Sequence, residues 1–258
     1  MPPPFVVKTM PGMDGLDDER RLLEKRAQRR IGKGLAAQLA AALPEGTTED
    51  TVSGADLRAI EASVPLRDGL YASLVEGVLL GVDVGRRQTE ARQGVGKDAG
   101  IGVDWTLVNA EAREWARFYA GQLVTGLDET TAKALRQALA EWIQNSLTYD
   151  ELLKEIGEAF GPERAARIAE TEITRAYAEG NRKAWKDGGV ITEMVWRTAN
   201  DERVCPECGA LDGQIVAVEG GEFVHPGGEG REKLWGRTYN QPPAHPRCRC
   251  WIVPETRR

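Results

Sequence analysis

The sequence is organised around two short runs, Cys205-Pro206-Glu207-Cys208-Gly209 and His245-Pro246-Arg247-Cys248-Arg249-Cys250. Together they hold all four cysteines of the chain and one of its two histidines. A C-x-x-C pair directs two thiolates at one centre across a tight turn, and the glycine after it lets backbone amides approach the sulfurs. The first run therefore predicts a zinc knuckle.

The second run, H-x-x-C-x-C, offers three donors for the two remaining positions of a tetrahedral site. If the segment is an extended strand, Cys248 and Cys250 face the same side and bind together, which leaves His245 outside the ligand set. If the turn at His245 closes on the site, His245 and Cys248 bind and Cys250 packs under the sheet. The five candidates for four positions are Cys205, Cys208, His245, Cys248 and Cys250.

Two disulfides or four unliganded thiols are the alternatives to a metal site. The chain opens with Met1-Pro2-Pro3-Pro4 and shows no leader that would direct it to an oxidising compartment. Unliganded cysteines do not usually cluster as C-x-x-C with H-x-x-C. A catalytic zinc is disfavoured, because neither the deaminase pattern nor H-E-x-x-H is present. We therefore expect a structural zinc ion.

The composition is that of an ordered globular chain. Of its 258 residues 41% are hydrophobic, which suffices for a core, and 29% are charged. The net charge of −6 argues against coating of DNA, so any nucleic-acid contact would be local. The longest apolar run, near residues 74–84, contains Glu76 and Asp83 and is too short to span a membrane.

Proline and glycine punctuate residues 1–16, which predicts an extended arm. Over residues 17–43 apolar side chains recur about every fourth position, which predicts a helix with one buried stripe. The other faces of this helix carry Arg20, Arg21, Lys25, Arg26, Arg29, Arg30 and Lys33. These cations form either a solvated face or a contact with DNA or an acidic partner surface. We expect that deletion of residues 1–43 would abolish assembly and leave the C-terminal fold intact.

A second helix is predicted from Pro65 to about Arg92, where apolar residues repeat at i+4. It completes an N-terminal helical region, residues 17–93. Residues 94–104 are rich in glycine and are interpreted as a flexible linker. They do not fit a phosphate-binding loop, because neither Ser nor Thr follows Lys97.

Residues 105–188 show helical periodicity in four segments. Gly126 separates the first segment from the second, and a capping box at Thr148–Glu151 starts the third. Pro162 precedes the fourth segment, residues 163–187, which glycines terminate.

Within the fourth segment, Glu172 and Arg175 lie one turn apart beside the apolar stripe. An unpaired charge would be costly there, so we predict that the two side chains form an ion pair. The pair either stabilises the fold or contacts a partner.

The periodicity changes after Gly189, and residues 189–258 are predicted to form a β module. Residues 190–198, 214–218 and 249–253 read as strands of a small antiparallel sheet, and residues 219–244 as a long loop between them. The fold class is therefore α+β: helical N-terminal and middle regions, followed by a zinc-stapled antiparallel module.

Several separated motifs occur together in the second half of the chain. They are the run Ala166–Tyr177, Gly180, Trp196, the run Asp201–Cys208, Asp212-Gly213 and the run His245–Cys250. In this order they resemble the phage Mu F-like minor head protein family, the phage head morphogenesis proteins, over roughly residues 105–254. Residues 1–100 match no motif of that family.

The resemblance implies a structural minor capsid protein of a tailed bacteriophage, at the portal vertex or the inner head surface, in head assembly or genome delivery. Its implied partners are the portal protein or the major capsid protein, with a local contact to packaged DNA. Its implied location is the virion, after assembly in the host cytoplasm. A zinc-associated enzyme, either a nuclease or a toxin-like effector, is the alternative. We expect no enzymatic activity, because only two histidines are available as a general base.

Overall fold

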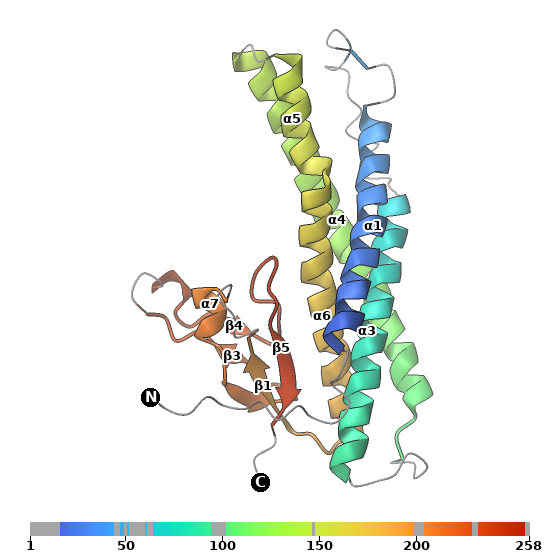
Figure 1. Ribbon diagram of the computed structural model, residues 1–258, viewed down its shortest axis with the longest axis vertical. Helices are drawn as coiled ribbons and strands as arrows, with labels where there is room; N and C mark the ends of the chain where they lie inside the picture. The colour runs from blue at the N-terminus through green and yellow to red at the C-terminus, as the bar shows by residue number, and fades with distance from the viewer. Residues whose placement is uncertain are drawn as a thin grey trace.

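The computed structural model describes residues 16–43, 47–48, 51, 60, 64–93, 102–145, 148–198, 204–228 and 232–255. Residues 1–15 of the predicted arm and most of the predicted linker lie outside these residues. Leu16, the last residue of the predicted arm, is the first residue of α1. The long helices are α1 (Leu16–Ala42), α3 (Val64–Gln93), α4 (Trp105–Asn145), α5 (Tyr149–Phe160) and α6 (Pro162–Gly188). They form an elongated helical body, and a small β module lies beside the end of α6 (Figure 1). This arrangement confirms the predicted α+β class.

The closest helix pair in the body is α3 with α6. Gly77, Gly81 and Gly85 of α3 face Ala176, Gly180 and Ala184 of α6. A Cβ atom at Gly81 would collide with the carbonyl oxygen of Tyr177, and one at Gly180 with that of Val78. The two backbones approach this closely because glycine leaves the space open.

Helix α1 belongs to the same body. Its predicted stripe is confirmed, because Leu23, Ala27, Ile31 and Leu35 are buried in one cluster with residues of α3 and α6. Removal of residues 1–43 would expose this apolar surface. The expected independence of the C-terminal fold from α1 is therefore not supported by the packing.

The prediction of two helices between residues 105 and 145 is wrong, since α4 is continuous through Gly126. Asp128, two residues after Gly126, is buried within α4, and its carboxylate accepts a hydrogen bond of 2.5 Å from Gln38 Nε2 of α1. Tertiary contact at this point outweighs the helix-ending tendency of glycine. α4 has buried side chains both before and after Gly126, among them Ala120 and Leu135.

The predicted helix boundaries around residues 148–189 are confirmed. Thr148 Oγ1 accepts from Glu151 N at 3.3 Å, and the Glu151 carboxylate accepts from Thr148 N at 2.8 Å, which completes the capping box. Helix α6 begins at Pro162 and ends at Gly188. The residue that caps it, Gly189, has a φ of 66°, the left-handed conformation that glycine adopts readily. Leu147, which the sequence would pair with Leu152 as a hydrophobic staple beside the capping box, lies outside the described residues.

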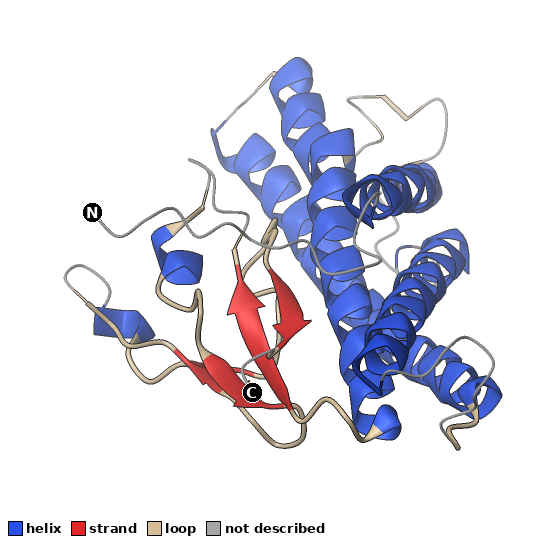
Figure 2. Cartoon of the chain, turned by 60° about the horizontal axis from the view of Figure 1, so that its bottom comes forward, coloured by secondary structure: helices blue, strands red, loops and turns tan. Residues whose placement is uncertain are grey.

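The module contains the predicted antiparallel sheet, whose strands are red in Figure 2. The strand order is β2-β1-β5. The strands are β1 (Glu193–Arg197), β2 (Ile215–Ala217) and β5 (Trp251–Pro254). The segment expected to be a long loop carries further structure, which corrects that prediction. It holds the two-stranded sheet β3 (Phe223–Val224) and β4 (Thr238–Tyr239) and a short 3-10 helix, η2 (Glu232–Leu234).

The core of the module extends into the helical body. Trp196 of β1 is fully buried and meets Phe223 edge to face, with ring centroids 5.1 Å apart. Trp185 of α6 lies in the same cluster and donates its indole hydrogen to Gln88 of α3. The sheet is thereby fixed against α6. Among the described residues, no helix has both the length and the apolar character that a membrane span needs.

Candidate metal centre

A one-turn helix, α7 (Pro206–Gly209), brings the first two thiols together. Cys205 precedes it in extended conformation, and its sulfur accepts a hydrogen bond of 3.3 Å from the Cys208 backbone amide. Pro206 starts the turn, where no amide hydrogen is needed. The tight turn directs both sulfurs to one side, as the C-x-x-C spacing requires.

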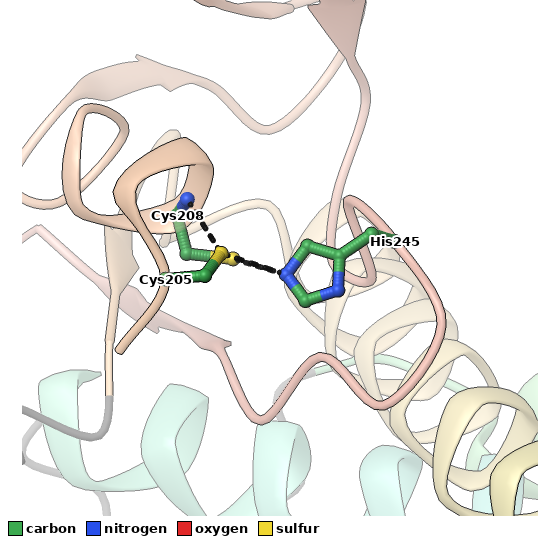
Figure 3. A group of neighbouring side chains, drawn as sticks. All are labelled: Cys205, Cys208 and His245. Carbon is green, nitrogen blue, oxygen red and sulfur yellow. Dashed lines mark hydrogen bonds between the residues drawn. The ribbon is translucent and has the colours of Figure 1, made fainter. Parts of the chain in front are cut away.

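His245 points at this pair of sulfurs (Figure 3). Its Nε2 lies 3.0 Å from Cys205 Sγ and 3.1 Å from Cys208 Sγ. Its Nδ1 lies 2.7 Å from the carbonyl oxygen of Pro246, to which it can only donate. The lone pair of the neutral ring is therefore on Nε2 and faces the thiols, the tautomer that metal binding requires.

Cys248 and Cys250 complete the cluster from the other side. Cys248 Sγ lies 3.6 Å from Cys208 Sγ. The donor atoms form two overlapping groups, Cys205 with Cys208 and His245, and Cys208 with Cys248 and Cys250, each within 4.8 Å. Cys208 belongs to both groups. All four cysteines are free thiols, so the structure contains no disulfide among them.

Hydrogen bonds among the buried thiols of Cys208, Cys248 and Cys250 shift their pKa values in different directions. Hydrogen bonding from Cys208, then from Cys250, lowers the pKa of Cys248 to about 2. The pKa of Cys208 is raised, first by its hydrogen bond to Cys248. The bond with Cys208 lowers the pKa of Cys250, but the bond to Cys248 and burial together raise it to about 12. Hydrogen bonds among the buried thiols therefore favour loss of the proton from Cys248 first, and a bound cation would favour the thiolate form of each sulfur that it contacts.

The donor spacing fits a zinc ion. Zn–S bonds of about 2.3 Å and Zn–N bonds of about 2.0 Å at tetrahedral angles place two sulfurs about 3.8 Å apart and a sulfur and a nitrogen about 3.6 Å apart. The observed separations of 3.6 Å, 3.0 Å and 3.1 Å each need a change of about 0.6 Å or less. The two groups must also draw closer together around an ion, because Cys205, Cys208, His245 and Cys248 do not form one group within 4.8 Å. A cavity of about 30 Å³ at this point is lined by Val204, Cys205, Cys208, His245, Arg247, Arg249 and Cys250.

Helix α6 holds the loop that carries His245 and Cys248. The Thr174 hydroxyl donates to the Cys248 carbonyl at 3.2 Å, and the Thr171 hydroxyl accepts from the Arg247 amide at 3.0 Å. Arg247 adopts a φ of 62°, unusual for a residue with a side chain, and its guanidinium bonds Glu163 at 2.7 Å. Three contacts to one rigid helix therefore fix the second half of the cluster.

The other histidine, His225, lies outside the cluster. It is fully buried, and its Nδ1 accepts from the Gly227 amide at 3.0 Å. Its backbone amide donates to the Arg237 carbonyl at 2.8 Å, and its carbonyl accepts from the Gly236 amide at 3.0 Å.

Glu172 and Arg175 lie together on α6, away from the cysteines. Arg175 Nε is 3.2 Å from Glu172 Oε2, which also accepts a hydrogen bond of 2.9 Å from the Tyr119 hydroxyl of α4. Burial raises the pKa of Glu172, and Arg175 opposes that shift. The Arg175 guanidinium lies 5.6 Å from the Tyr119 ring centroid, so the group ties α4 to α6.

The seven cations of α1 differ in their surroundings. Arg20 bonds Glu24 at 3.1 Å, while Arg26 and Arg30 approach Glu76 of α3 at 3.5 Å and 2.6 Å. The four others, Arg21, Lys25, Arg29 and Lys33, are exposed.

Several contributors to the cluster were not predicted from the sequence. Thr171 and Thr174 lie three residues apart on the α6 face toward the loop, and Arg247 stands between two candidate ligands. In the sequence, Thr171 and Thr174 lie within the run Ala166–Tyr177, and Arg247 lies within the run His245–Cys250. These positions in the family motifs do not reveal what the side chains contact. Asp212, also in a quoted motif, accepts from the Thr198 amide at 2.8 Å and fixes the end of β1.

A comparison with known families matches residues 133–253 to the family described as Phage Mu protein F like protein. The matched region begins within α4 and includes α5, α6 and the whole donor cluster. The match confirms the resemblance predicted from the motifs. No curated protein and no solved structure matches the chain.

Proposed function

We propose, from the premise that residues 133–253 belong to the phage Mu F-like family, that this protein is a structural head morphogenesis protein of a tailed bacteriophage. The family match is the observation that carries the proposal. It coincides with the part of the chain in which α6 and the Cys/His cluster are joined. The matched unit is therefore a β module mounted on a long helix.

The proposed place of action is the portal vertex or the inner head surface, in head assembly or genome delivery. The partners are the portal protein or the major capsid protein, with a local contact to packaged DNA. The exposed cations of α1 support a contact with an acidic surface, while the net charge of −6 limits any contact with DNA to a local one.

We further propose that the cluster holds one structural zinc ion through Cys205, Cys208, His245 and Cys248. When bound, zinc supplies a crosslink among segments that are distant in sequence. Cys248 is preferred to Cys250, although Cys250 lines the cavity, because the distance from Cys208 Sγ to Cys248 Sγ is 3.6 Å, close to the value zinc requires. Three thiolates give the site a net negative charge, and the guanidinium groups of Arg247 and Arg249 border it.

This donor set supports a structural role and not a catalytic one. A catalytic zinc keeps one position open for water, whereas four protein donors close the coordination shell. The fifth candidate, Cys250, is buried and lines the same cavity, so a further thiol borders the four donors.

Mass spectrometry of purified virions tests the proposed function. We expect the protein in mature heads at low copy number, and its amount in DNA-filled and emptied particles will show whether it leaves with the genome. Absence from both kinds of particle, when the portal protein is detected, contradicts the proposal.

A further inference from the structure

Among the residues that the structure describes, acidic partners neutralise only part of the basic surface of α1. Arg20, Arg26 and Arg30 are paired with Glu24 or Glu76, as described above. Arg21, Lys25, Arg29 and Lys33 form no ion pair with any residue that the structure describes. They follow one another at intervals of four, so they form a single stripe about 18 Å long on the helix.

A groove lies against the middle of this stripe, and we name it the α1/α6 groove. It has a volume of about 400 Å³ and is lined by Lys25, Gln28, Arg29, Gly32, Pro162 and Ala165. A Cβ atom at Gly32 would lie 3.7 Å from the Ala165 Cβ, so small residues form the floor where the helices meet. Two cations flank this floor, and Leu22 on the same side of α1 is 58% exposed.

The combination of an apolar floor with cationic walls selects the chemistry of the partner. A DNA backbone needs the cations but makes no use of an apolar floor. An acidic protein segment uses both, since its carboxylates pair with Lys25 and Arg29 while an apolar side chain enters the groove. The exposed charges would mainly speed association and make it sensitive to salt.

We propose that the α1/α6 groove binds an acidic, amphipathic segment of another head protein. The inference rests on the proposed function and adds the class of partner and the surface that receives it. Charge complementarity with the unpaired stripe is the ground for choosing a protein segment.

Binding of a fluorescent peptide of alternating Glu and Leu residues to the full chain, measured by anisotropy, tests the proposal. The double variant Lys25→Glu with Arg29→Glu should weaken binding about tenfold or more, which corresponds to about 1.4 kcal/mol. The control, Arg113→Glu with Arg117→Glu on α4, makes the same charge change at two exposed arginines four residues apart. It should weaken binding less than about twofold, as expected of screened distant charges.

A second variant, Gly32→Leu, separates protein from DNA as the partner. Its Cβ fits beside Ala165, and the rest of the side chain fills the groove without changing charge. Peptide binding should fall, while binding of a short duplex should not change. If the duplex binds more tightly than the peptide and ignores Gly32→Leu, or if both double variants weaken peptide binding equally, the proposal is wrong.

The same variants in phage separate this inference from the proposed function. Wild-type protein present in virions, with the groove variants excluded and the α4 variant incorporated, supports both. If all variants are incorporated normally, the groove is not the docking surface and the proposed function stands. If the wild-type protein is absent from virions, the proposed function is wrong, whether or not the peptide binds to the purified protein.

Discussion

The helical body and the β module are stabilised by different means. In the body, long helices bury continuous apolar stripes, and the tightest contact brings Gly81 and Gly180 backbone to backbone. The module has short strands, the longest being β1 with five residues. Its center is a cluster of cysteines and a histidine beside Trp196 and Phe223.

This difference indicates where each region is vulnerable. The body depends on shape, so an added methyl group at a close crossing is its most damaging change. The module has little regular structure, and under our proposal it depends on its donor atoms, which a cation would hold together. The two regions meet at α6, which packs on α3 along one face. Through Thr171 and Thr174 it also forms hydrogen bonds with the loop that carries His245 and Cys248.

The largest effect is expected from loss of the donor shared by both groups of the cluster. Cys208→Ser should abolish zinc binding, whose apparent free energy in small modules is about 10 to 16 kcal/mol. Residues 190–254 should then become sensitive to protease while the helices persist. Elemental analysis and limited proteolysis measure both effects. Cys250→Ser is the matched control and should retain zinc; if it loses zinc and Cys248→Ser does not, the fourth ligand is Cys250.

The body should respond most strongly at the α3 and α6 crossing. Gly81→Ala places a methyl group against the Tyr177 carbonyl, and we expect a loss of about 3 kcal/mol or more in the free energy of unfolding. The matched control is Gly126→Ala in α4, where the added Cβ would have no neighbour within 4 Å outside its own helical turn. This change should raise the free energy of unfolding by about 0.5 to 1 kcal/mol. Denaturant unfolding followed by circular dichroism measures both, and equal effects would contradict the account.

A smaller effect is expected where the two regions join. Thr174→Val removes the hydroxyl that donates to the Cys248 carbonyl, which should cost about 1 kcal/mol and weaken zinc binding severalfold. Competition with a chelator measures the zinc affinity. Thr130→Val, which changes an exposed helical threonine, should leave the affinity unaltered. Unchanged affinity in Thr174→Val would show that α6 does not position the loop.

The mildest prediction concerns pH and belongs to the body. Because burial raises the pKa of Glu172, the folded state holds its proton more tightly than the unfolded state. The contribution of protonated Glu172 to the stability of the folded state is complete below the pKa that Glu172 has in the unfolded chain. It is lost as the pH rises through the higher pKa that Glu172 has in the folded protein. Glu172→Gln should flatten this part of the curve of stability against pH. Glu114→Gln, an exposed change on α4, should leave it as in wild type.

The helical stripes, the capping box and the strands were predictable because each depends on local spacing. The spacing that predicts the buried stripe lies within residues 23–35, and the spacing that predicts the capping box lies within residues 148–151. The continuity of α4 was not predictable, because Asp128 is held by Gln38 from a distant helix. The candidate donors were evident from residue type, whereas Thr174 and Tyr119 act through contacts that only the fold creates.

The central claim is that the module depends on a metal ion and the body does not. Hydrogen exchange of the purified protein, with zinc content measured and then removed by a chelator, tests it most directly. We predict one zinc per chain, and on chelation a loss of protection in β1, β2 and β5 with protection retained in α3 and in the N-terminal half of α6. A zinc-free wild-type protein with a fully protected module, or simultaneous loss of protection in both regions, would contradict the account.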